Sequence, residues 1–237
     1  KSIQHSALPS VFPPYPNRKE FEIFASMHTA KEVGGDFYDF FRIDEDRIGI
    51  VMADVSGKGI PAAIFMAVSR TLIRTIGLQG YTPGECLTKS NDLLSKESVD
   101  CMFVTVFYAI YNVKTGEIEY SNGGHNSPVI IKADGRIEML PTSTSCMVGA
   151  VPGITYSNEK LTLSVGDTLV MYTDGVNEAM NEANEEYGDD RMMAFSATQK
   201  GQGCQATIDN QMADVKAFVG NAPQSDDITL LTLTRKA

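Results

Sequence analysis

The chain has 237 residues, of which 43% are hydrophobic and 21% are charged, a balance that indicates a globular protein with a sizeable core. Its formal net charge of −10 argues against nucleic acid and anionic membrane surfaces as partners, and is compatible with binding divalent cations. The four cysteines show no CxxC spacing, which argues against zinc, and so few cysteines in a chain this long argue against a disulfide framework. We expect a cytoplasmic chain, or the cytosolic domain of a larger, membrane-anchored protein.

The first 19 residues are rich in proline, which prevents helix formation and predicts an extended lead-in segment. Residues 20–237 contain no internal repeat and no linker, so they are expected to form a single domain. A strand is predicted at residues 20–28, where apolar and polar side chains alternate.

A β-hairpin with an aspartate at each open end is predicted next. Residues 36–43 and 47–53 have strand composition, and the polar turn Asp44–Asp46 separates them. If Ile43 pairs with Arg47, Asp36 lies opposite Asp54 on the same face. Two close carboxylates repel unless a cation lies between them, so this register indicates a metal site. The alternative is a pair of ordinary strand-end aspartates that face water.

Two helices follow the hairpin. The first begins at Gly59-Ile60-Pro61, and its apolar residues recur at helical spacing at Ile64, Ala67, Val68, Leu72 and Ile76. Arg70 and Arg74 lie one turn apart on another face, which we expect to be solvated. The second begins at Thr82-Pro83-Gly84-Glu85, which combines an N-cap with a capping-box glutamate, and runs to about Lys96.

The remainder alternates hairpins with helical stretches. Strands are predicted at residues 102–111, 117–121, 128–132, 136–140, 161–163, 167–173 and 228–233. An amphipathic helix is predicted at residues 205–219, and residues 176–200 are helical in parts. Sequential hairpins with segregated helices predict an α+β sandwich of antiparallel sheets.

Four aspartates share one context: each lies at a strand end beside a glycine or another small or acidic residue. They are Asp36, Asp54, Asp174 and Asp226. Carboxylates without histidine or thiolate favour Mg²⁺ or Mn²⁺, and two such ions can activate a water for attack on a phosphate. A calcium-binding domain is a weaker alternative because no EF-hand pattern is present.

Two further residues, Asp227 and His125, are secondary candidates. Asp227 could replace Asp226 but is expected to cap or turn the chain. His125, in a glycine loop, could transfer a proton, although a histidine there more often hydrogen-bonds its own loop. Asp39 lies three residues from Asp36, on the opposite strand face, and is expected to be structural.

Five motifs in order resemble the SpoIIE-type (RsbU-like) branch of the metal-dependent, protein phosphatase 2C-like serine/threonine phosphatases. They are VGGDFYDFF, ADVSGKGIPAA, NGGHNSP, YTDGVNEA and SDDITLLTL. The resemblance covers nearly all of residues 8–234. It implies a four-layer αββα fold with two antiparallel sheets, a two-metal centre of Mn²⁺ or Mg²⁺, and direct attack by a metal-bridging hydroxide.

The resemblance also implies a role for each matching residue. Asp36, Asp174 and Asp226 would bind the second metal. Asp54 would bridge both metals, and the Val55 carbonyl would bind the first. The eukaryotic relatives carry a histidine at the position of Ser56 and an arginine that grips phosphate. Neither has a match here, and Lys31 is the nearest base to that arginine's position.

The substrate that the resemblance implies is a phosphorylated protein of the anti-sigma-factor antagonist type in a bacterium. It also implies control by an upstream sensor module and homodimerisation through the N-terminal segment. The alternative is a catalytically idle regulatory module of the same fold that binds a signalling partner.

Overall fold

The computed structural model describes residues 8–97, 101–141 and 145–237, so residues 1–7 of the predicted lead-in segment lie outside the described range. The chain divides into two compact units that interleave in sequence. The described part of the first unit comprises residues 8–10, 31–97, 101–127, 141 and 145–162. The second comprises residues 11–30, 128–140 and 163–237.

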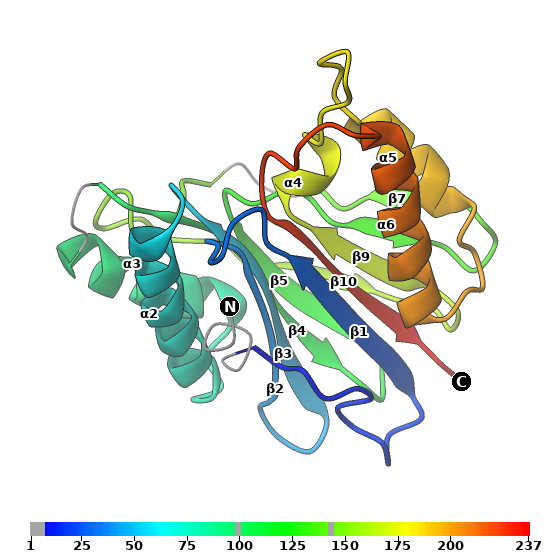
Figure 1. Cartoon of the computed structure of the whole chain (residues 1–237). Coiled ribbons are helices and arrows are strands. Elements are labelled where there is room, and N and C mark those ends of the chain that lie inside the picture. The colour runs from blue at the N-terminus through cyan, green and yellow to red at the C-terminus, as the bar shows by residue number, and fades with distance from the viewer. Residues whose placement is uncertain (1–7, 98–100, 142–144) are drawn as a thin grey trace. The chain divides into compact units, whose positions relative to one another are not determined.

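The first unit is built on a five-stranded antiparallel sheet with the order β2-β3-β4-β5-β8 (Figure 1). Its strands are β2 (Phe37–Arg42), β3 (Arg47–Val55), β4 (Val104–Asn112), β5 (Glu117–Gly123) and β8 (Glu159–Thr162). Phe37 pairs with Ala53, and the Ile43 amide donates to the Arg47 carbonyl at 2.9 Å. The predicted hairpin register is therefore confirmed.

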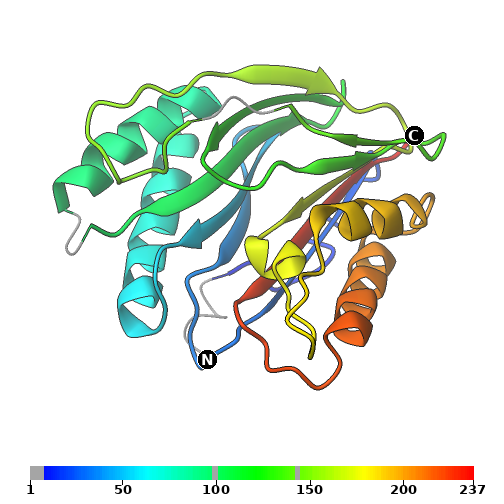
Figure 2. The same ribbon diagram turned by 90° about the horizontal axis from the view of Figure 1, so that it is seen from above.

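Two helices pack on this sheet (Figure 2). Helix α2 (Ile60–Gly77) contacts β2 and β3, and α3 (Pro83–Glu97) contacts β4 and β5. The predicted capping box begins α3: the Thr82 amide donates to Glu85 Oε2 at 2.9 Å, and the Glu85 amide reaches Thr82 Oγ1 at 3.4 Å.

The buried face of α2 is not the apolar stripe that its spacing suggests. Ile64 and Val68 are 62% and 42% exposed. The buried side is formed by Ala62, Met66, Ser69, Ile73 and Ile76. Apolar or small residues occupy most positions of this helix, so periodicity alone does not distinguish its faces. Length and composition would also allow α2 to cross a membrane, a test that helices of soluble proteins pass as well.

An ion-pair network sets the rotation of α2. Asp39 on β2 is 1% exposed, and it lies 3.1 Å from Arg70 Nη2 and 2.7 Å from Arg74 Nη1. Burial raises the pKa of the Asp39 carboxyl, and the two guanidinium groups oppose that shift. The expectation of a solvated arginine face was wrong, because both arginines bind a buried carboxylate. Asp39 has the structural role expected of it.

The second unit holds another five-stranded antiparallel sheet with the order β1-β10-β9-β6-β7. Its strands are β1 (Phe21–His28), β6 (Val129–Ile131), β7 (Ile137–Met139), β9 (Thr168–Tyr172) and β10 (Ile228–Arg235). Its helices are α4 (Asp174–Asn177), α5 (Asp189–Ala197) and α6 (Cys204–Val219). Helix α6 packs on β1 and β10, and its Ile208 and Val215 enter the core. The predicted hairpin of residues 128–132 and 136–140 is present as β6 and β7.

Candidate active site

The first pair of predicted ligands lies at the open end of the β2–β3 hairpin. Asp36 immediately precedes β2, and extending the observed register by one position puts it opposite Asp54. A Cβ atom on Gly35 would lie 2.7 Å from the Val55 carbonyl oxygen and 3.4 Å from Asp54 Oδ1. Only glycine therefore allows the chain before Asp36 to approach Asp54 and Val55 this closely. Asp36 is 1% exposed, so this pair is partly withdrawn from water.

A threonine that the sequence reasoning missed links His125 to this pair. Thr105 on β4 pairs directly with Asp54, and its Oγ1 donates to the Asp54 carbonyl at 3.3 Å. The same hydroxyl lies 2.9 Å from His125 Nδ1. The only signal in the sequence was one polar residue in the apolar run of residues 102–111.

His125 is also held by its own loop, as the structural interpretation anticipated. Its amide donates to Asn122 Oδ1 at 2.7 Å, and its carbonyl accepts from Asn122 Nδ2 at 2.8 Å. The ring is buried at 7% exposure. His125 therefore touches the Asp54 backbone through Thr105, which makes it a positioning residue in this geometry.

The second pair lies where β9 ends and β10 begins. The Thr173 amide donates to the Thr229 carbonyl at 3.1 Å, and the Thr229 amide donates to Thr173 Oγ1 at 3.0 Å. A Cβ on Gly175 would lie 1.9 Å from the Asp227 carbonyl oxygen. Glycine after Asp174 thus lets the start of α4 contact the chain that carries Asp226.

Asp227 has a different environment from Asp226. Its carboxylate accepts a hydrogen bond from the Ala30 amide at 2.8 Å, and its own amide donates to Asp226 Oδ1 at 2.9 Å. Asp227 is 5% exposed and ties the segment after β1 to the start of β10. This contact is consistent with a structural residue. Lys31, the secondary candidate that follows Ala30, is exposed.

Glu178 is a further acidic residue beside the second pair. Partial burial raises the pKa of its carboxyl, and the neighbouring charges of Asp174, Glu186, Asp226 and Asp189 raise it further. The sequence gives one indication that Glu178 lies beside Asp174. It follows Asp174 by four residues, which places both side chains on one side of a helical turn. The concentration of negative charge here favours a bound cation.

The donor set fits Mg²⁺ or Mn²⁺. Its predicted members are carboxylates and one backbone carbonyl, all oxygen ligands, and these cations commonly keep several waters. Within the described residues no three His, Cys, Asp or Glu side chains form a metal-binding group. The carboxylates meet instead as two pairs, one in each unit. Their assignment as metal ligands, with Val55, stays a prediction.

The structure has the features expected of the PP2C-like phosphatase fold. These are two antiparallel sheets with helices and paired aspartates at strand ends. The chain belongs to the SpoIIE family: the family model described as stage II sporulation protein E matches residues 44–236. The SiaA-PP2C domain of Pseudomonas aeruginosa has the same fold, with a TM-score of 0.85 and 20% identity over 100% of this chain and 94% of that one. The predicted α+β sandwich class is thereby confirmed.

The relatives found among curated proteins include two that align over most of this chain. Protein IcfG of Synechocystis is 28% identical over 99% of this chain and 40% of its own length. The phosphoserine phosphatase RsbU of Bacillus subtilis is 29% identical over 70% of this chain and 50% of its own length. The chain therefore spans half or less of each of these two relatives. The comparisons support a phosphatase of the PP2C type.

Proposed function

We propose that this chain is a metal-dependent protein phosphatase domain that removes phosphate from serine or threonine. The proposal rests on two pairs of aspartates, Asp36 with Asp54 and Asp174 with Asp226. Each pair lies where a glycine allows two backbone segments to approach closely. The raised pKa of Glu178 supports a cation at the second pair. The SpoIIE family and the phosphoserine phosphatase RsbU support this class of reaction.

The chain's own residues would hold and orient the reacting groups. In the first unit Asp36, Asp54 and the Val55 carbonyl would bind cation, and in the second unit Asp174 and Asp226 would do so. Bound divalent cations would supply an activated water and offset the charge of the phosphoryl oxygens. The Thr105 hydroxyl would hold the Asp54 backbone in place through its hydrogen bond to the Asp54 carbonyl. The His125 ring would orient that hydroxyl.

The proposed substrate is a phosphoprotein of the anti-sigma-factor antagonist type, in the cytoplasm. An upstream sensor module and dimerisation through the N-terminal segment are proposed as its control. These proposals follow the family resemblance. The chain's net charge of −10 makes nucleic acid an unsuitable partner.

Hydrolysis of p-nitrophenyl phosphate with and without Mn²⁺ tests the proposal. Turnover should depend on Mn²⁺ and fall by about a hundredfold or more in Asp54→Asn. Asp46→Asn, at the other end of the same hairpin, is the matched control and should keep its turnover. Calorimetry of Mn²⁺ binding completes the test. Binding without turnover would favour the idle regulatory module, and absence of binding would contradict the two-metal proposal.

A further inference from the structure

The second unit contains a cavity of about 520 Å³ that none of the predicted chemistry uses. Residues of α4, of α6 and of the segment between α6 and β10 line it, and Figure 1 shows where these elements lie in the chain. Its apolar lining includes Ala179, Met180, Met212, Val215, Val219 and Ile228. A concave, mainly apolar hollow of this size is typical of a binding site.

The cavity borders the second aspartate pair. Gly175 and Ser225 both line it, and they are the chain neighbours of Asp174 and Asp226. A molecule with a phosphate at that pair would therefore reach the cavity with its adjoining atoms.

Lys216 is the lysine among the polar residues of the lining, which also include His28, Asp209 and Gln224. Lys216 lines it from the last turn of α6, and its side chain is exposed. Within the described part of the chain, the Lys216 ammonium makes no ion pair or hydrogen bond. In a chain of net charge −10, a lysine beside an apolar hollow favours a ligand that combines an apolar group with an acidic one.

We propose that this cavity takes an apolar side chain of the phosphoprotein substrate, from a residue close to the phosphoserine and next to an acidic residue that pairs with Lys216. The inference rests on the proposed phosphatase function and adds a source of specificity to it. Cations and carboxylates recognise a phosphate group, which every phosphoprotein has. Discrimination between phosphoproteins therefore requires contacts outside the phosphate, and a side-chain cavity adjoining Asp174 and Asp226 supplies them.

The experiment uses Met180 and Met212, two of the eleven methionines, as reporters in the intact chain. The protein is labelled with ¹³C at the methionine methyl groups and titrated in the presence of Mg²⁺. The probes are phosphoserine peptides of glycine and serine in which one leucine is moved along the positions on both sides of the phosphoserine. The leucine-free peptide is the reference.

At least one leucine peptide should shift the Met180 and Met212 signals and bind about tenfold to a hundredfold more tightly than the reference, since its leucine is buried. Ala213→Phe, which fills the cavity from α6, should abolish that gain. Ala217→Phe is the matched control: it is exposed on the next turn of α6 and outside the cavity, so the gain should remain. Methionine signals far from the cavity report whether each variant is folded.

A glutamate next to the leucine should tighten binding severalfold in the wild type and have no effect in Lys216→Gln. If no leucine peptide shifts Met180 and Met212, the inference is overturned, and binding of decanoate at the same signals would point to a small-molecule site instead. Because the titration requires no turnover, its failure is separate from a failure of p-nitrophenyl phosphate hydrolysis. Leucine-dependent shifts without any turnover would support the cavity and contradict the proposed function.

Discussion

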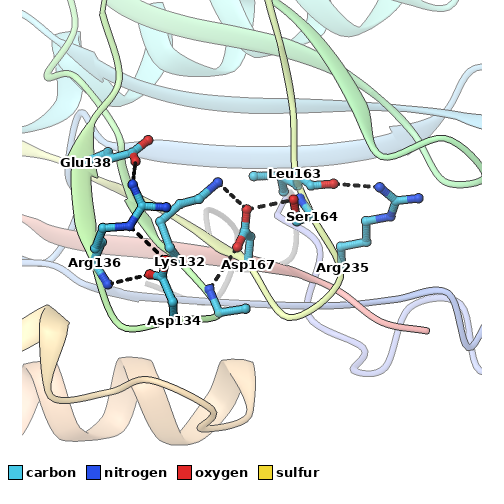
Figure 3. Close-up of polar contacts among 9 residues, drawn as sticks. Lys132, Asp134, Arg136, Glu138, Leu163, Ser164, Asp167 and Arg235 are labelled. Carbon is cyan, nitrogen blue, oxygen red and sulfur yellow. Dashed lines mark hydrogen bonds and ion pairs between the residues drawn. The ribbon is translucent and has the colours of Figure 1, made fainter.

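The two ends of the sheet in the second unit carry aspartates with different surroundings. Asp167 precedes β9, and Asp174 follows it about 20 Å further along the strand direction. Asp167 is 1% exposed and binds Lys132, the Ala133 amide at 2.9 Å and the Ser164 amide at 3.0 Å (Figure 3). At the other end, partial burial and the neighbouring charges of Asp174 and Asp226 raise the pKa of the Glu178 carboxyl.

The comparison shows how a structural carboxylate differs from a candidate metal ligand. At the Asp167 end a lysine ammonium and two backbone amides bind the carboxylate, so the charge of Asp167 stabilises the fold directly. At the Asp174 end the Gly175 contact brings the segments of Asp174 and Asp226 together, and burial with the neighbouring negative charges raises the pKa of Glu178. An arrangement of that kind is favourable when a cation is bound.

The largest effect on stability is expected at the Asp167 end. Asp167→Asn should lower the free energy of unfolding by about 3–5 kcal/mol, because it leaves the Lys132 ammonium, 18% exposed, without its carboxylate. Asp134→Asn is the control: its pair with Arg136 is exposed, so its loss should cost much less than the loss of Asp167. Urea unfolding at neutral pH measures both. Equal losses would contradict the distinction between the two aspartates.

A smaller loss is expected from the glycine that forms the other end. Gly175→Ala should destabilise by about 1–3 kcal/mol, since its Cβ would overlap the Asp227 carbonyl and force the backbone apart. Gly203→Ala is the matched control, because its Cβ would meet only the flexible Glu22 side chain at 3.2 Å. Thermal unfolding compares the two. The contact would be refuted if Gly175→Ala were as stable as Gly203→Ala.

Metal addition should act at the Asp174 end and not at the Asp167 end. Mn²⁺ at about a hundred times its dissociation constant should stabilise the wild type by about 2.7 kcal/mol. Asp174→Asn should lose most of this gain without being less stable in the metal-free state, whereas Asp134→Asn should keep the gain. Thermal unfolding with and without Mn²⁺ measures it. The same Mn²⁺ effect in Asp174→Asn would remove that residue from the metal site.

The local features of the fold could be predicted from the sequence, and the features that depend on distant contacts could not. The β2–β3 register was predicted because the short turn at Asp44–Asp46 determines it. The buried face of α2 was not, because it depends on Asp39, which is more than thirty residues from Arg74 in the chain. Sequence motifs indicated Asp174 as a ligand but not Glu178, whose shifted pKa depends on carboxylates from three segments.

The smallest effect concerns pH. The folded-state pKa of Glu178 is raised above 4.5, so the native protein binds the proton more readily and loses stability as pH rises through the interval above 4.5. Glu178→Gln should therefore raise the free energy of unfolding by less than about 1 kcal/mol at neutral pH without metal. The gain is small because the side chain is exposed. The gain should vanish near pH 4 and in saturating Mg²⁺.

The control Asp134→Asn should behave in the opposite way, since hydrogen bonds from Arg136 lower the pKa of Asp134 and stabilise the charged form. Unfolding curves across pH measure both, and a gain in Glu178→Gln that is unchanged by pH would mean that its charge is not the cause.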